Sequence, residues 1–312
     1  SESDLEKDNV LIIENNKITG KFSKEGEEEC FEYVPRVSGI YRFDFESNDV
    51  KTNYKFNICT ENQNMIISSE YSSKGKNVEL NAGEKYIIKV KQYSGFPEYE
   101  INIGVPNEIC EVEGNNIEGT LLYEGEEDKY TYIAPVTGQY RFNFASDNDQ
   151  SNYKFYLYTE NNEKLAGQYY SDNGKTLDLD KGETYTIVIA QYLGYASYKV
   201  TIGVPNLPKR IEGNNFSGSL LYIDQKDCYT YVAPKNGRYR FDFMSDNDRN
   251  NYKFYLYAEN NEKLVGQYYS DDGKTIDLGA DKEYRIEVIQ YSGFENFIIG
   301  RKDRGSSTGG KY

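Results

Sequence analysis

The sequence repeats itself with a period of 99 residues, and this repeat restricts the fold more than any other feature. Its register holds without insertion until the last expected strand, where residues 297–300 match 198–203 with two residues missing. Each copy is long enough to bury a core of its own. We therefore expect three tandem domains. The matched sets include Gly20, Gly119 and Gly218; Tyr41, Tyr140 and Tyr239; and Gln92-Tyr93, Gln191-Tyr192 and Gln290-Tyr291.

A Gly-Val-Pro-Asn segment ends each of the first two copies and marks a boundary. We predict modules at residues 10–107, 108–206 and 207–300, with flexible segments at 1–9 and 301–312. The connections between the modules are short. A semi-rigid row is therefore expected rather than freely tumbling domains.

Within each copy, apolar and polar residues alternate with a period of two, which is typical of half-buried strands. In the second copy, for example, Tyr140, Phe142 and Phe144 alternate with Arg141 and Asn143. The pattern predicts about seven or eight short strands per copy, bounded by Gly, Asn and Asp turns, and no amphipathic helix. Two antiparallel sheets that each have one apolar face bury those faces by packing together. The predicted fold class is all-β, with three tandem jelly-roll-like antiparallel β-sandwich modules.

The order of motifs within a copy indicates a family. In the third copy the motifs are IEGNNFSGSL at 211–220, DCYTY at 227–231, GRYRF at 237–241, FYLY at 254–257 and KEYRIEV at 282–288. This order resembles the bacterial pre-peptidase C-terminal domain and the related collagen-binding domains of clostridial collagenases. The resemblance covers nearly all of every copy. It implies jelly-roll-like sandwiches that are attached to secreted enzymes and surface proteins, some of which bind calcium, collagen or polysaccharide.

Charge and composition exclude several classes of partner and of chemistry. The net charge of −15 repels phosphate backbones and anionic membranes, so we expect no nucleic-acid partner. No stretch of about 18 apolar residues exists, and membrane insertion is not expected. Histidine is absent, which excludes Ser-His and Cys-His nucleophile pairs and histidine metal ligands. The four cysteines predict no intrachain disulfide, and we expect a monomer.

An acidic turn in the second and third copies places oxygen-bearing side chains at alternate positions. This spacing matches the start of a calcium loop, although the glycine and the glutamate that complete such a loop are missing. Asp and Asn are also favoured in hairpin turns that bind nothing. The sequence leaves a calcium site and a solvated turn as alternatives. The candidate ligands are Asp147, Asp149 and Ser151 in the second copy, and Asp246, Asp248 and Asn250 in the third.

A group of tyrosines lies on the outward phase of two neighbouring strands in the second and third copies. The first copy has Asn57, Cys59 and Glu70 at these positions, and polar residues of this kind argue for exposure. Exposed rings on a sheet face can stack on sugars while their hydroxyls donate hydrogen bonds. The alternative is cross-strand pairing on an ordinary sheet surface. The candidate ligand-binding residues are Tyr156, Tyr158, Tyr169, Tyr255, Tyr257 and Tyr268.

Catalysis is the remote alternative. Acidic residues are numerous enough for a glycosidase pair, but their clusters recur on turns of several copies, and no hydrolase, phosphate-binding or zinc motif is present. We predict a non-catalytic binding array of a secreted or cell-surface bacterial protein. Its expected partner is a polymer, either a polysaccharide or a matrix or host protein, because repeated weak sites gain avidity. A purely structural spacer that presents another domain is the other candidate.

Overall fold

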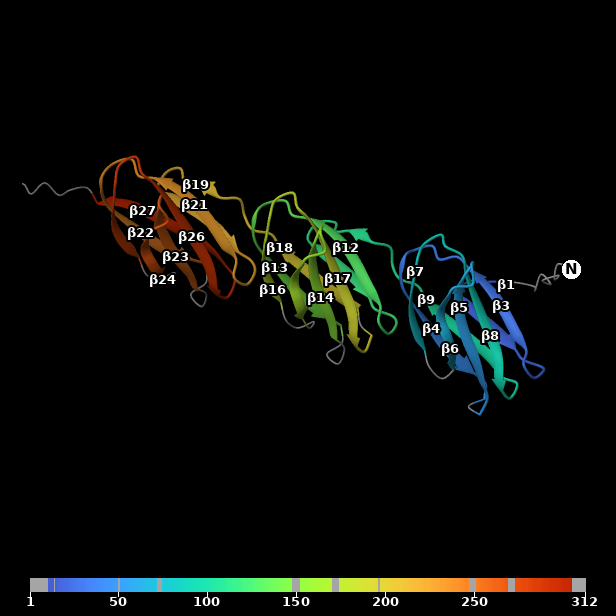
Figure 1. The fold of residues 1–312 in the computed structure, drawn as a ribbon. Helices are drawn as coiled ribbons and strands as arrows, with labels where there is room; N and C mark the ends of the chain where they lie inside the picture. The colour runs from blue at the N-terminus through green and yellow to red at the C-terminus, as the bar shows by residue number, and fades with distance from the viewer. Residues whose placement is uncertain are drawn as a thin grey trace, which may run out of the picture.

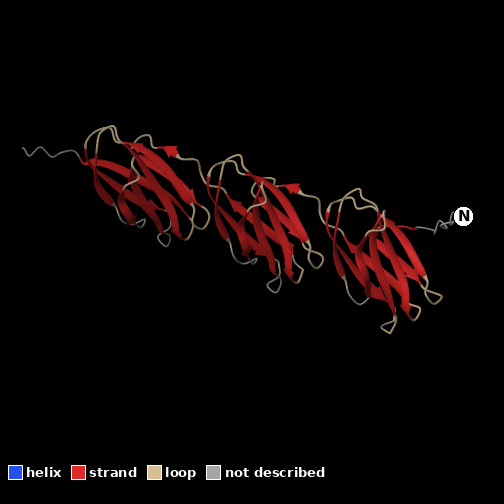
Figure 2. Cartoon of the chain, viewed as in Figure 1, coloured by secondary structure: helices blue, strands red, loops and turns tan. Residues whose placement is uncertain are grey.

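The computed structural model describes residues 11–13, 15–49, 51–71, 75–147, 152–169, 174–195, 197–246, 251–268 and 273–304. In these ranges the chain forms three β-sandwich modules in a row, built from strands and loops without a helix (Figures 1 and 2). The all-β prediction is confirmed. No helix in this described part of the chain has the length and apolar character needed to cross a membrane.

The strands of the three modules occupy equivalent positions along the repeat. Module 1 contains β1 (Leu11–Ile12), β2 (Lys17–Lys21), β3 (Glu28–Tyr33), β4 (Gly39–Ser47), β5 (Asn53–Thr60), β6 (Met65–Tyr71), β7 (Lys76–Leu80), β8 (Tyr86–Ser94) and β9 (Glu98–Gly104). Module 2 contains β10 (Cys110–Glu111), β11 (Asn116–Thr120), β12 (Glu127–Ile133), β13 (Gly138–Ser146), β14 (Asn152–Thr159), β15 (Lys164–Tyr169), β16 (Lys175–Leu179), β17 (Thr184–Leu193) and β18 (Ser197–Gly203). Module 3 contains β19 (Lys209–Arg210), β20 (Asn215–Leu220), β21 (Lys226–Val232), β22 (Gly237–Ser245), β23 (Asn251–Ala258), β24 (Lys263–Tyr268), β25 (Lys274–Leu278), β26 (Glu283–Ser292) and β27 (Glu295–Arg304).

Each module consists of a four-stranded and a five-stranded sheet. In module 1 the orders are β2-β9-β4-β7 and β1-β3-β8-β5-β6, and the other modules repeat them. Without β1, the two sheets have the strand orders of a jelly roll, and successive strands alternate between the sheets except for β5 and β6, which pair with each other in the five-stranded sheet. The two-residue strands β1, β10 and β19 pair in parallel with β3, β12 and β21. These short strands differ from the purely antiparallel prediction, because the segment that enters each module lies along the edge of its five-stranded sheet.

Each module has its own aromatic core, and the inward residues are those that the alternation predicts. In module 2, Tyr153, Phe155 and Leu157 of β14 are at most 1% exposed. Phe155 packs against Phe142 of the facing sheet with ring centroids 5.1 Å apart, and the equivalent pairs in modules 1 and 3 are separated by 5.2 and 5.3 Å. Tyrosine is tolerated in this core because its hydroxyl reaches the rim, where Tyr153 donates to the carbonyl of Ala145 at 3.1 Å.

The last strand corrects the sequence alignment. Phe297 pairs with Gly218 as Tyr198 pairs with Gly119, so the 99-residue register continues and no residues are missing. β27 extends to Arg304, four residues beyond the predicted end of module 3 at residue 300, and pairs with β22 along this extension. The predicted flexible tail at 301–312 therefore begins with strand residues. The remaining expected flexible residues, 1–9 and 305–312, lie outside the described ranges.

The modules follow one another in the same orientation (Figure 1) and meet through a tyrosine. Tyr123 of module 2 lies against Gly104 at the end of β9, where a Cβ atom would be only 2.7 Å from the tyrosine ring. The Tyr123 hydroxyl donates to the carbonyl of Ile40 in module 1 at 3.1 Å. The equivalent Tyr222 packs on Gly203 at the second junction, again 2.7 Å from a hypothetical Cβ. The row thus has a repeated contact at each connection.

Candidate functional site

The predicted tyrosines of β14 and β23 lie on the outer face of the five-stranded sheets. Tyr156 and Tyr158 stack on each other with ring centroids 6.2 Å apart and an angle of 29° between the ring planes. Tyr255 and Tyr257 repeat this arrangement at 6.3 Å and 24°. The stacking follows from strand geometry, because every second side chain points to the same face. The four rings are half-buried rather than fully exposed.

Cationic side chains cover these tyrosines. The Lys164 Nζ atom lies 5.5 Å from the ring centroid of Tyr156, and Lys263 repeats this contact on Tyr255 at 5.3 Å. Such cation–π contacts hold a ring in place at a partly exposed surface. Burial also raises the pKa of Tyr156 above its ordinary value. The hydroxyl is therefore kept as a neutral hydrogen-bond donor.

In module 2 the two tyrosines border a depression of about 720 Å³ on the outer sheet face. Its floor includes Val188 and Ala190, which point outward from β17 yet are only 6% and 9% exposed. Tyr156 lies opposite Val188 in the strand register. Lys154 lines the same depression and places its ammonium 4.3 Å from the ring centroid of Tyr192. Module 2 thus combines an apolar floor, two aromatic walls and cationic groups.

Module 3 carries the same tyrosines above a different floor. Glu287 stands where module 2 has Val188 and is only 5% exposed. It pairs with Arg285 and with Lys226, the latter at 3.6 Å. The Arg285 guanidinium lies 4.2 Å from the ring centroid of Tyr257. The two faces therefore share their aromatic side chains and differ in the polarity of the floor.

The remaining predicted tyrosines, Tyr169 and Tyr268, end strands β15 and β24. Their backbones pair with Phe155 and Phe254, next to the stacked rings in the sequence. The structure describes the strand positions of these two residues but not their side chains. We call the outer sheet surface that carries Tyr156 and Tyr158 in module 2, or Tyr255 and Tyr257 in module 3, a tyrosine face. Module 1 has no such face, because Cys59 stands at the position of Tyr158 and is only 3% exposed.

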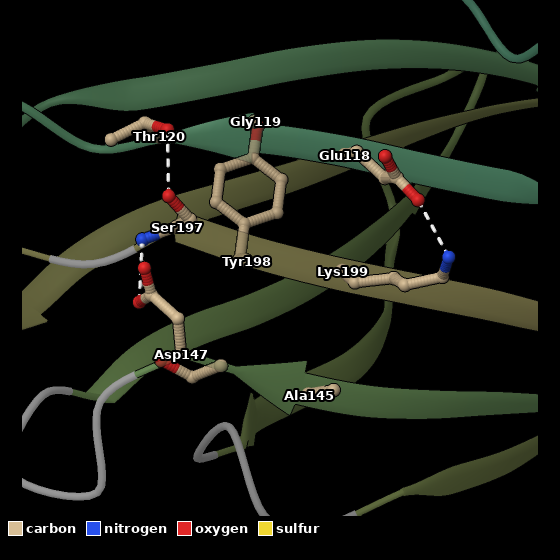
Figure 3. A pocket seen from close by; sticks show the side chains of 9 residues that line it. Glu118, Gly119, Thr120, Ala145, Asp147, Ser197, Tyr198 and Lys199 are labelled. Carbon is tan, nitrogen blue, oxygen red and sulfur yellow. Dashed lines mark hydrogen bonds and ion pairs between the residues drawn. The ribbon is translucent and has the colours of Figure 1, made fainter.

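Only Asp147 and Asp246 of the predicted metal ligands fall within the described residues, whereas Asp149, Ser151, Asp248 and Asn250 lie outside them. Asp147 Oδ1 accepts the backbone N–H of Ser197 at 3.0 Å, at the edge of an open depression over Gly119 and Tyr198 (Figure 3). Asn48 makes the same kind of bond to Glu98 in module 1 at 3.1 Å.

Asp147 and Asp246 have a structural role, which is to accept a backbone N–H. Neutral Asn48 performs the same role in module 1, so this role needs no cation. Among the described residues, no group of three or more Cys, Asp or Glu side chains has an arrangement suited to a metal ion. The calcium site stays a prediction.

Sequence reasoning missed a third group of tyrosines. Tyr93, Tyr192 and Tyr291 recur near the ends of β8, β17 and β26, beside the loops that lead into β9, β18 and β27, and their exposed fractions are 50%, 37% and 48%. The repeated Gln-Tyr pair followed by a glycine was the available signal. Because repeated tyrosines elsewhere in the chain belong to the core, repetition alone could not separate this group.

No family model matches this chain, and no curated protein matches it. Among solved structures, the chain is similar to the CUB1-EGF-CUB2 domains of rat MASP-1, at 7% identity and a TM-score of 0.22 over 62% of this chain and 99% of that chain. The corresponding human MASP-1/3 structure gives 7% identity and a TM-score of 0.21 over 59% of this chain and 99% of that chain. Tripeptidyl peptidase 2 gives 11% identity and a TM-score of 0.24 over 87% of this chain and 32% of its own. These scores are too low to assign a family or a function.

Proposed function

We propose that the chain is a non-catalytic binding array of a secreted or cell-surface bacterial protein, and that it binds a polymer through the tyrosine faces of modules 2 and 3. The observation that carries this proposal is the stacked pair Tyr156–Tyr158, held by Lys164 beside a depression with an apolar floor. The pair recurs as Tyr255–Tyr257. The extracellular location rests on the resemblance to the pre-peptidase and collagen-binding domains.

The chemistry of the faces suits a flat, uncharged partner. Aromatic rings stack on the apolar faces of sugars and on apolar protein side chains, and neutral tyrosine hydroxyls donate hydrogen bonds at the edge of the contact. Rings that are fixed before binding lose little conformational entropy when the partner arrives. Because the chain carries a net charge of −15, a polyanion is disfavoured.

Two faces on one chain favour a polymer over a small ligand. Once a polymer has bound one face, the second binding event becomes intramolecular, and its effective concentration raises the overall affinity by about 10²- to 10⁴-fold. The connection between modules 2 and 3 is short, and Tyr222 packs on Gly203 there. A defined spacing between the faces is therefore part of the proposal.

A structural spacer is the second candidate, and the junctions favour it. Tyr123 contacts Gly104 and Ile40 of the preceding module, so the first junction resists bending. A spacer needs these junction contacts and does not need the tyrosine faces. Substitutions at the junctions should therefore impair a spacer, whereas substitutions on the tyrosine faces should impair binding.

Pull-down of the full chain on insoluble cellulose, chitin, xylan and fibrillar collagen tests the proposal. We expect retention on at least one of these materials and its loss in the double variant Tyr156→Ala with Tyr255→Ala. The matched control is Met244→Ala with Ile298→Ala, which removes exposed apolar side chains from the other sheet. Retention of the tyrosine variant at the wild-type level overturns the assignment of the site. No retention of the wild type on any material supports the spacer.

A further inference from the structure

A second aromatic surface lies where the chain crosses from the five-stranded to the four-stranded sheet of each module, between β8 and β9, β17 and β18, and β26 and β27. We call each of these loops, together with the strand end before it, a tip. Each tip exposes two rings separated by three positions in the sequence. Module 1 has such a tip, although it has no tyrosine face. The exposed fractions are 50% for Tyr93 and 54% for Phe96, 37% for Tyr192 and 56% for Tyr195, and 48% for Tyr291 and 54% for Phe294.

A β-bulge directs the first ring of each tip. In module 1, Tyr54 pairs with Gln92 and Asn53 pairs with Ser94, so Tyr93 is the extra residue of β8. The same irregularity occurs at Tyr192 and at Tyr291. Bulges redirect a side chain out of the regular alternation and are common next to functional sites. Three bulges at one position indicate that the outward tyrosine belongs to the architecture of the module.

The tips are also braced. Gln92 donates from Nε2 to the carbonyl of Gly95 at 2.8 Å, and its Oε1 atom accepts the backbone N–H of Gly26 at 2.9 Å. Gln191 and Gln290 make the equivalent pairs of bonds in the other modules at 3.0 to 3.1 Å. One glutamine side chain therefore connects the turn before β3 to the loop after β8 through hydrogen bonds, and this fixes the position of the tip.

A lysine holds the bulge tyrosine from the neighbouring strand. The Lys55 Nζ atom lies 4.5 Å from the Tyr93 ring centroid, and the equivalent distances in modules 2 and 3 are 4.3 and 4.5 Å. Gly95 follows with a φ of +64°, a conformation that glycine adopts without strain, and this turn places Phe96 at the tip. Each module thus exposes two rings, and the lysine holds the first of them in place before a partner binds.

The three tips face the same side of the row. In module 2 the bond from Ser197 N–H to Asp147 places the tip next to the end of β13, and the same bond fixes the tip in the other modules. Because successive modules have the same orientation (Figure 1), equivalent positions project in the same direction. The tips form a line of three similar aromatic sites.

We propose that the tips bind a neutral polysaccharide that runs along the row, with the tip rings stacking on sugar faces. This inference rests on the proposed polymer-binding function, although it uses other residues. A polysaccharide of identical units offers the same apolar sugar face to every tip, whereas a folded protein offers a different surface at each point. The net charge of −15 selects an uncharged chain over a polyanionic one.

Affinity electrophoresis of the full chain in gels with soluble β-glucan, xyloglucan or galactomannan tests this proposal, with polygalacturonate as the anionic probe and fibrillar collagen as the protein probe. The tip variants are Tyr93→Ala with Phe96→Ala, Tyr192→Ala with Tyr195→Ala, and Tyr291→Ala with Phe294→Ala. We expect each pair to weaken binding to a neutral glycan about tenfold, and all three together to abolish it. Met244→Ala with Ile298→Ala is the matched apolar control.

The module 1 tip separates this proposal from the tyrosine faces, because module 1 has no such face. If Tyr93→Ala with Phe96→Ala weakens binding also in the Tyr156→Ala, Tyr255→Ala background, the tips act by themselves. If the triple tip variant binds every neutral glycan like the wild type, the tip proposal is wrong, even where the face variant loses binding. Binding to collagen or polygalacturonate alone also overturns it. Unchanged melting temperatures of the variants show that lost binding is not lost folding.

Discussion

Asn107, the last residue of the Gly-Val-Pro-Asn segment between modules 1 and 2, donates from Nδ2 to the buried carboxylate of Asp128 at 2.7 Å. Asp128 is 2% exposed and also accepts a hydrogen bond from the Tyr198 hydroxyl in the opposite sheet at 2.5 Å. One buried carboxylate therefore connects the linker to both sheets of the module that follows. Asn206 and Asp227 repeat the linker bond at 2.8 Å.

Replacing the linker asparagine should destabilise the following module. Asn107→Ala leaves the buried Asp128 carboxylate without one of its donors, and such a loss costs about 1–3 kcal/mol. We expect a lower unfolding midpoint for module 2, measured by calorimetry of the full chain. Asn206→Ala is the matched change for module 3. A wild-type thermogram for both variants would show that solvent replaces these donors at no cost.

The pH dependence of stability should change on substitution of Glu126. This residue is 1% exposed, and burial, followed by repulsion from Asp128, raises the pKa of its carboxyl above the ordinary value of 4.5. The folded state then binds a proton at pH values where the unfolded chain has released it, so stability falls as the pH rises through this range. We expect Glu126→Gln to melt at a higher temperature than the wild type at neutral pH, and the difference to disappear below pH 4.5.

Module 3 provides the control for this prediction. Gln225 occupies the equivalent position, where its Oε1 atom accepts the N–H of Leu221 at 2.6 Å and its Nε2 atom donates to Asp227 at 2.9 Å. Gln225→Glu should introduce the same loss of stability at neutral pH that Glu126→Gln removes. Equal melting temperatures for wild type and both variants from pH 4 to 8 would contradict the assignment of a raised Glu126 pKa.

The first junction should loosen when its tyrosine is removed. Tyr123→Ala deletes the ring that packs on Gly104 and the bond to Ile40, and leaves other contacts in place, such as Arg42 with Glu124 at 3.1 Å. We expect a broader distribution of overall dimensions in small-angle X-ray scattering, while the cores of the separate modules keep their stability. Gly104→Ala should act in the same direction, because its methyl group collides with the ring. Scattering profiles identical to the wild type would show that other contacts fix the junction.

The calcium hypothesis predicts a difference between melting in EDTA and in millimolar calcium. A site saturated at about 100 times its dissociation constant adds about 2.7 kcal/mol of stability. Asp147→Asn with Asp246→Asn should keep the fold, because Asn48 makes the same backbone contact in module 1, and should remove the calcium effect. An identical melting temperature of the wild type under both conditions would exclude calcium binding at these turns.

Much of the fold could be predicted because its signals are local. Alternating side chains on β13 and β14 identify strands and their inward faces, and the repeat divides the chain into modules. The short strands β1, β10 and β19 could not be predicted, since two residues at a sheet edge carry no periodicity. The register of β27 was misjudged because Gly300 was matched to Gly203, whereas strand pairing aligns it with Thr201.

The candidate sites were also predicted only in part. Outward positions such as Tyr156 follow from alternation, and their sequence difference from module 1 separated them from the core. The half-burial of these rings depends on Lys164 and on side chains of neighbouring strands, which the sequence of β14 does not specify. Tyr93 escaped prediction because a bulge breaks the alternation at that residue. The bulge depends on how β8 pairs with the distant strand β5, and the repeated Gln-Tyr pair alone does not reveal that pairing.

The common orientation of the modules gives the row two unlike ends. If neighbouring modules were related by a two-fold axis, a polymer could bind the row equally well with its chain running in either direction. Here every module presents its tip in the same direction, and only modules 2 and 3 add a tyrosine face to the tip. A polysaccharide has a reducing and a non-reducing end, so the row and its partner should align in one relative sense.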